Sequence, residues 1–108
     1  MAMAYLFDGK ATVLIGTHTH VPTSDHRIME KGTAYQTDIG MCGDYNSVIG
    51  MNRDNSLNKF LKESSTKKHF PALGKATISG VLVTADEKTG LALKIQQIII
   101  GGALQERF

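Results

Sequence analysis

One stretch decides how this sequence folds: Ala11-Thr12-Val13-Leu14-Ile15-Gly16-Thr17-His18-Thr19-His20-Val21-Pro22-Thr23. Residues 11–15 are mostly apolar and partly β-branched, which is typical of a short strand that is buried on both faces and has a neighbour on each side. Pro22 ends the regular structure. The stretch therefore predicts a strand that leads directly into two histidines.

His18 and His20 are separated by a single residue. In an extended segment, side chains at positions i and i+2 point to the same side, so both imidazoles can face one pocket at the end of the strand. Neutral imidazole is a good ligand for zinc, iron and related metals. We therefore expect His18 and His20 to be metal ligands. The alternative is structural: histidine and threonine side chains would cap the end of a strand.

Composition places the chain among ordinary globular domains. With 108 residues, we expect a single domain with one core. Twelve Lys and Arg against 10 Asp and Glu give a net charge of +2, which favours neither nucleic-acid nor membrane binding. Cys42 is the single cysteine, so no internal disulfide can form. The first residues lack a signal-peptide pattern. We expect a soluble, cytoplasmic protein.

The rest of the chain predicts a mixture of helices and strands. Residues 1–7 favour a helix that stops at Asp8-Gly9, residues 21–32 a loop, residues 33–39 a strand and residues 40–47 an ordered loop.

The second half predicts a helix and a hairpin. Asp54 or Asn55 can cap the helix, which ends at Ser64-Ser65. Its apolar residues Leu57, Phe60 and Leu61 share a face. Residues 66–74 are expected to be irregular. Residues 76–85 and 91–100 predict an antiparallel hairpin with a loop at 86–90, followed by a frayed tail.

Three blocks of sequence carry a resemblance to a known family: Gly16-Thr17-His18-Thr19-His20-Val21-Pro22-Thr23, Gly32-Thr33-Ala34-Tyr35-Gln36-Thr37-Asp38-Ile39-Gly40-Met41-Cys42-Gly43 and Ser47-Val48-Ile49-Gly50-Met51. Together they resemble the C-terminal part of the YmdB-type calcineurin-like metallophosphoesterases. The resemblance extends over residues 1–100, in the same order.

The resemblance implies an α/β fold, in the form of an α+β portion of a β-sandwich flanked by helices, with a C-terminal antiparallel hairpin. It implies a metal-dependent phosphodiesterase that acts on cyclic nucleotides such as 2′,3′-cyclic AMP. Of two divalent metal ions (iron, manganese or zinc), His18 would bind one and His20 the other. It assigns no catalytic residue in this chain.

The family's other ligands lie in motifs that this sequence lacks: an aspartate on the first strand, a glutamate and asparagine, an asparagine followed by the proton-donating histidine, and a further histidine. We therefore expect residues 1–108 to be the C-terminal portion of the enzyme domain, without its N-terminal half and inactive alone, so whether the chain is itself an enzyme stays open. Alone it is not expected to bind both metals.

The resemblance implies that the intact enzyme binds a nucleotide phosphodiester and that this chain is complemented by an N-terminal half. A second copy of the chain is the other expected partner, because a strand without its neighbours has unpaired edges. The alternative function is a non-catalytic β-rich module that self-associates through unpaired strand edges. Asp38 and Asp44 could orient the two candidate histidines, whereas His26 and His69 are expected to be solvated.

Overall fold

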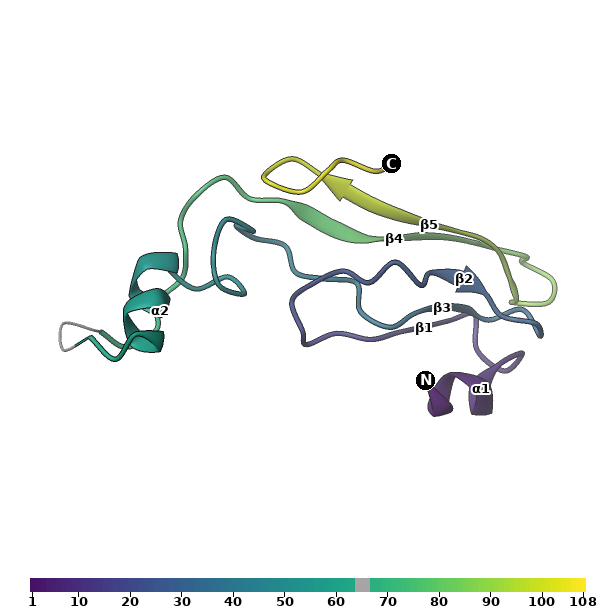
Figure 1. Ribbon diagram of the computed structural model, residues 1–108. Coiled ribbons are helices and arrows are strands. Elements are labelled where there is room, and N and C mark those ends of the chain that lie inside the picture. Colours follow the sequence, from purple (N-terminus) through teal and green to yellow (C-terminus); the bar gives the residue numbers. More distant parts are fainter. Residues whose placement is uncertain (64–66) are drawn as a thin grey trace.

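The computed structural model describes residues 1–63 and 67–108, which form two short helices and five strands (Figure 1). The elements are α1 (Ala2–Phe7), β1 (Val13–Ile15), β2 (Arg27–Ile28), β3 (Ala34–Gln36), α2 (Arg53–Phe60), β4 (Ile78–Ala85) and β5 (Ala92–Ile100). This mixed α/β arrangement confirms the predicted fold class.

Strand β3 is the centre of a three-stranded sheet with the order β1-β3-β2. It pairs parallel with β1, with Val13 opposite Ala34, and antiparallel with β2. All three residues of β3 are buried. Strand β1 lies at an edge, and Val13 and Ile15 are each 39% exposed. The expectation that β1 is buried between two neighbours is therefore wrong within the described residues, because β3 is the one strand that pairs with it there.

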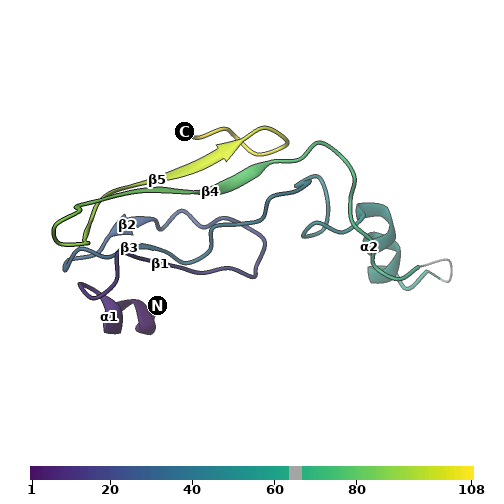
Figure 2. The ribbon, with the colours of Figure 1, turned by 180° about the vertical axis from the view of Figure 1, so that it is seen from behind.

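The antiparallel hairpin of β4 and β5 is confirmed, with Ile78 opposite Ile100 and a bulge between Thr84 and Ala85. It lies along the three-stranded sheet, which β5 contacts through β2 and β3 (Figure 2). The expected frayed tail is wrong. Beyond the glycines after β5 the chain turns back, and the backbones of Ile99 and Arg107 exchange two hydrogen bonds of 2.7 and 2.9 Å.

The interior is largely polar. A small apolar core joins Ala4, Met29 and Tyr35, with Leu14 packed against it. The largest fully buried side chains are Gln36, Thr33, Thr77 and Asp38. Buried polar groups need hydrogen-bond partners, so the packing of this chain depends on a hydrogen-bond network as much as on apolar contact.

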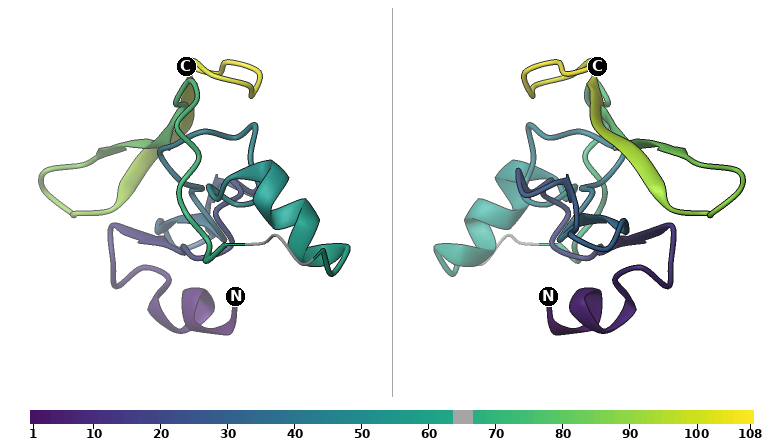
Figure 3. Two further views of the ribbon diagram at one scale, coloured as in Figure 1. Left: turned by 90° about the vertical axis from the view of Figure 1, so that its left-hand side faces the viewer. Right: turned by 90° about the vertical axis from the view of Figure 1, so that its right-hand side faces the viewer.

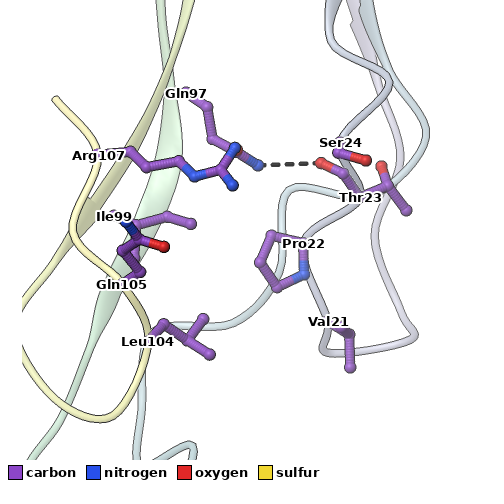
Figure 4. A pocket seen from close by; sticks show the side chains of 9 residues that line it. All are labelled: Val21, Pro22, Thr23, Ser24, Gln97, Ile99, Leu104, Gln105 and Arg107. Atoms are coloured by element: carbon purple, nitrogen blue, oxygen red, sulfur yellow. Dashed lines mark hydrogen bonds between the residues drawn. The ribbon is translucent and has the colours of Figure 1, made fainter.

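The carbonyl oxygen of Thr23 joins the two sheets. It accepts one hydrogen bond from Nε2 of Gln36 on β3 and another from Nε2 of Gln97 on β5, each 2.9 Å long. Figure 4 shows the second of these bonds beside a cavity of about 210 Å³ that lies between the loop after β1, β5 and the C-terminal tail. The hairpin is thereby fixed to the loop that follows β1.

Helix α2 lies to one side of both sheets (Figures 1 and 3), and the molecule is elongated, 58 × 28 × 17 Å. The N-cap of α2 is Asn52, whose side chain accepts a hydrogen bond from the backbone N–H of Asn55 at 3.0 Å. The predicted cap at Asp54 or Asn55 is therefore two or three residues late, since Asn52 supplies the same chemistry earlier. The helix ends at Phe60, and the predicted end at Ser64-Ser65 lies outside the described residues.

The shared apolar face of α2 is not buried. Leu57, Phe60 and Leu61 are each more than half exposed, and Asn55 instead ties the helix to the returning chain through bonds with the backbone of Lys67 and Lys68. Within residues 1–63 and 67–108, no helix is long and apolar enough to cross a membrane.

Candidate functional site

The segments that follow β1 and β3 stay side by side beyond the ends of the strands. The backbone N–H of Gly16 donates to the carbonyl of Gln36, and that of Ile39 donates to the carbonyl of Gly16, both at 3.0 Å. A Cβ atom at Gly16 would collide with the carbonyl oxygen of Thr37. Glycine therefore permits the close approach that brings the histidine loop to the end of β3.

His18 and His20 lie in this loop and not on an extended strand. Their φ angles are 112° and 67°, both outside the extended region. The alternation expected from an extended segment therefore does not apply, because regular structure ends at Ile15. His18 is exposed and His20 is half-buried. Such backbone conformations are costly for residues other than glycine and must be held by their surroundings.

Asp38 holds the backbone between the two histidines. Its Oδ2 accepts from both the backbone N–H and the hydroxyl of Thr19 at 2.8 Å, and its Oδ1 accepts from the N–H of Gly40 at 2.8 Å. Burial of this carboxyl, which is 1% exposed, opposes its ionisation. The bonds from Thr19 and Gly40, with a smaller contribution from the charge of His20, nevertheless keep the pKa of Asp38 below its ordinary value. Asp38 thus acts on the loop through Thr19.

A second anchor fixes the ring of His20. Its Nδ1 lies 2.7 Å from the carbonyl oxygen of Ile49. A carbonyl can only accept, so in the neutral ring Nδ1 carries the proton and Nε2 keeps its lone pair. A metal-binding histidine typically has this arrangement, in which one nitrogen donates to a carbonyl and the other is left for the metal. The surroundings of His20 therefore fit a metal ligand.

Among the described residues, no three His, Cys, Asp or Glu side chains come together so as to hold a metal ion. His18 and His20 therefore belong to no complete set of metal-ligating side chains within the described part of the chain. Asp44 accepts from the N–H groups of Asn46 and Gly74 and has no bond to either histidine. His69 is exposed, as expected, whereas the expectation of a solvated His26 is wrong, because its Nδ1 is buried with no hydrogen-bond partner among residues 1–63 and 67–108.

A cavity of about 320 Å³ adjoins His20. The loop between β3 and α2 supplies most of its wall. The cavity is lined by His20, Val21, Met41, Tyr45, Ser47, Val48 and Ile49.

Sequence reasoning named Asp38 as a residue that could orient the histidines but not its hydrogen bonds to Thr19, through which it acts. It missed two further features of this site: the cavity and the bond from His20 to Ile49. One signal was available for the bond from His20 to Ile49. Val48 and Met51 form a tight turn with two mutual backbone bonds, and Ile49 and Gly50 have φ angles of 48° and 93°. A glycine at the second central position is a mark of such turns.

A sequence profile of the family described as YmdB-like protein matches residues 1–98. The chain belongs to the YmdB-like family. It is 44% identical over 100 residues to the 2′,3′-cyclic-nucleotide 2′-phosphodiesterase of Bacillus subtilis (strain 168). The match covers 93% of this chain and 38% of that relative.

Two solved structures share the fold of this YmdB-like chain. A protein from Thermus thermophilus described as hypothetical aligns with a TM-score of 0.83 and 37% identity, over 95% of this chain and 40% of its own. A structure described as a novel phosphatase from Mycoplasma pneumoniae aligns with a TM-score of 0.83 and 40% identity, over 93% of this chain and 36% of its own. The chain thus spans less than half the length of the relatives it matches.

Proposed function

We propose that this chain supplies part of the active site of a metal-dependent phosphodiesterase in the cytoplasm, with cyclic nucleotides such as 2′,3′-cyclic AMP as substrates. The observation that carries the proposal is the His18-Thr19-His20 loop, held by Asp38 and with Nε2 of His20 left available by the bond from Nδ1 to Ile49. The 44% identity to a 2′,3′-cyclic-nucleotide 2′-phosphodiesterase supports the substrate class.

His18 and His20 would each hold one of two divalent ions, which are iron, manganese or zinc. When bound, such ions polarise a phosphoryl oxygen and activate water. The chain's own contribution is positional. Asp38 keeps the loop backbone in place through Thr19, and Ile49 keeps the imidazole of His20 in the tautomer that has a lone pair on Nε2.

We further propose that activity requires the complementing N-terminal part of the family domain, because the described residues bring no three metal-ligating side chains together. The test is to mix the chain with the N-terminal part of the Bacillus relative and to measure metal-stimulated hydrolysis of bis-p-nitrophenyl phosphate and 2′,3′-cyclic AMP. We expect negligible activity from the chain alone and activity from the mixture.

Single substitutions sharpen this test. His18→Ala and His20→Ala should each abolish the activity of the mixture, whereas His69→Ala, at an exposed histidine far along the chain, should leave it unchanged. Metal content of the mixture, measured by elemental analysis, should fall with the first two variants. The proposal would be contradicted by a folded mixture that hydrolyses neither substrate. It would also be contradicted if His18→Ala and His20→Ala left the hydrolysis rate of the mixture unchanged.

The second candidate is a non-catalytic module that self-associates, and the position of β1 favours it. This strand pairs on one side with β3, and its Val13 and Ile15 are partly exposed. Met3 and Leu6 of α1 are also largely exposed. Edge strands with apolar side chains pair readily with a further strand. Light scattering should then detect an oligomer of the chain alone, and a monodisperse monomer would exclude this candidate.

A further inference from the structure

The cavity beside His20 is bordered by apolar side chains that face water. Val21, Val48 and Ile49 are each about half exposed. Apolar groups gathered around a concavity are typical of ligand sites. The volume of about 320 Å³ lies at the lower end of the range for small-molecule pockets, roughly 300–1,000 Å³.

The hydroxyl groups in the wall are already engaged by the backbone. Oη of Tyr45 donates to the carbonyl of Met41 at 2.9 Å and accepts from its N–H at 2.8 Å. Oγ of Ser47 donates to the carbonyl of Asp44 and accepts from the N–H of Gly50 at 2.8 Å. The wall therefore offers an aromatic ring, a thioether and methyl groups to a ligand.

Met41 lies against a turn whose glycine makes room for it. A Cβ atom at Gly50 would lie 3.2 Å from Sδ of Met41, and Gly50 has a φ of 93°. The same turn places the carbonyl of Ile49 on Nδ1 of His20. One turn thus shapes the cavity and orients the candidate metal ligand, so the two belong to one binding region.

We infer that this cavity binds the base of a nucleoside cyclic phosphate whose phosphate lies at His20. The inference rests on the proposed function and adds the subsite for the base. A base presents two flat, weakly polar faces, which suit a wall of Tyr45, Met41 and Val48, and base–aromatic stacking tolerates every base. None of the lining residues is acidic, so none repels the anion. Purines should bind better than pyrimidines, because their larger rings contact more of the wall. Adenine and guanine should bind about equally, because the wall hydroxyls are already engaged and cannot distinguish their polar groups.

The first test uses the metal-free chain with ¹³C-labelled methyl groups of methionine and valine. We expect 2′,3′-cyclic AMP to shift the NMR signals of Met41 and Val48, with 2′,3′-cyclic GMP binding within about threefold of it and 2′,3′-cyclic CMP more weakly. Ribose 5-phosphate should not shift them. Met3, which is exposed on α1, is the internal control. Equal shifts with ribose 5-phosphate, or equal shifts at Met3, would overturn the inference.

The second test uses Val48→Asp, at a half-exposed wall position, and Leu73→Asp as the matched control. Leu73 is 94% exposed and does not line the cavity. Val48→Asp should weaken binding of 2′,3′-cyclic AMP at least tenfold, and Leu73→Asp should change it less than twofold. Equal effects of the two substitutions would overturn the inference.

Both tests measure binding without metal and without turnover, so they separate the base subsite from the proposed activity. The chain could bind nucleotides in a base-dependent way while the reconstituted mixture hydrolyses neither substrate. That result would refute the proposed function and retain the subsite as a nucleotide-binding site. Hydrolysis of bis-p-nitrophenyl phosphate without any response of Met41 to 2′,3′-cyclic AMP would retain the function and overturn the subsite.

Discussion

The strand-end region, which we define as residues 16–25 and 36–40, is marked by buried polar side chains, and the α2 segment, residues 48–63 and 67–74, by an exposed apolar face, although its helix also buries Asn55 and Ser56. In the first, Gln36 and Asp38 are almost completely buried and hydrogen-bonded to loop backbone. In the second, Phe60 is 83% exposed although it is apolar. The difference shows that this chain uses its interior to fix the conformation of the histidine loop.

If that comparison holds, Asp38→Ala should be the most destabilising substitution in either region. It leaves the N–H groups of Thr19 and Gly40 without their acceptor in a partly buried place, and each such loss costs about 1–3 kcal/mol. We expect the free energy of unfolding, measured by urea denaturation, to fall by about 3–4 kcal/mol.

Asp86→Ala is the matched control for Asp38→Ala. Asp86 also accepts from two backbone N–H groups, those of Lys88 and Thr89, but in the exposed hairpin loop, where water replaces it. Its loss should cost under about 1 kcal/mol. Equal losses of stability in the two variants would show that the contacts of Asp38 contribute no more to stability than those of an exposed carboxylate.

Gly16→Ala tests the close approach of the two loops. The added methyl group would collide with the carbonyl of Thr37, and overpacking of this kind typically costs about 1–3 kcal/mol. We expect a loss near the upper end in thermal or urea unfolding. Gly80→Ala on β4, where a Cβ meets nothing within 4 Å, should change stability by less than about 0.5 kcal/mol. A neutral Gly16→Ala would show that the loops separate easily.

Acid should weaken the strand-end region through Asp25. Burial raises the pKa of this carboxyl, but hydrogen bonds from the hydroxyls of Thr23 and Thr37 and the N–H of Thr37 outweigh burial and lower the pKa to about 2. A pKa below the unfolded value means that protons bind the unfolded chain more tightly. The stabilisation is therefore complete above about pH 4–5 and is lost as the pH falls towards 2.

Asp25→Asn isolates this effect. Since part of the Asp25 side chain is exposed to water, we expect it to reduce stability at pH 7 by about 1 kcal/mol and to flatten the decline in the urea midpoint between pH 5 and pH 2. An unchanged pH dependence would show that Asp25 is not a source of the acid sensitivity.

The smallest effect is expected in the α2 segment. Phe60→Ser removes a large apolar side chain that is mostly in water already, so the free energy of unfolding should change by less than about 0.5 kcal/mol. A loss of several kcal/mol would show that Phe60 is covered in solution, for example by a second copy of the chain. Measuring the variant at two protein concentrations separates these cases.

Sequence reasoning succeeded where the determinants are local. The hairpin follows from two β-rich runs, residues 76–85 and 91–100, around a loop at 86–90, and the first helix stops at the Asp8-Gly9 signal. The family resemblance is likewise a property of the sequence alone, and the profile match confirms it.

Sequence reasoning failed where contacts between distant parts of the chain determine the structure. The exposure of Val13 and Ile15 depends on which strands lie beside β1. The left-handed backbone of His18 and His20 depends on hydrogen bonds that Thr19 and His20 donate to distant acceptors, Asp38 and Ile49. Gly50 is a local signal for the turn at Ile49, but no local pattern says that this turn meets His20 or that Asp38 meets Thr19, so the residue types of the candidate site were predictable and their geometry was not.

The shared acceptor at Thr23 has a consequence for the order of folding. Its carbonyl binds Gln36 and also Gln97, which is 74 residues away in the chain. Contacts across such separations form late, because a long loop must close first. During synthesis, the histidine loop therefore remains incompletely anchored until β5 has left the ribosome, and premature termination before Gln97 would release a chain that carries both histidines without the bond that fixes their loop to the hairpin.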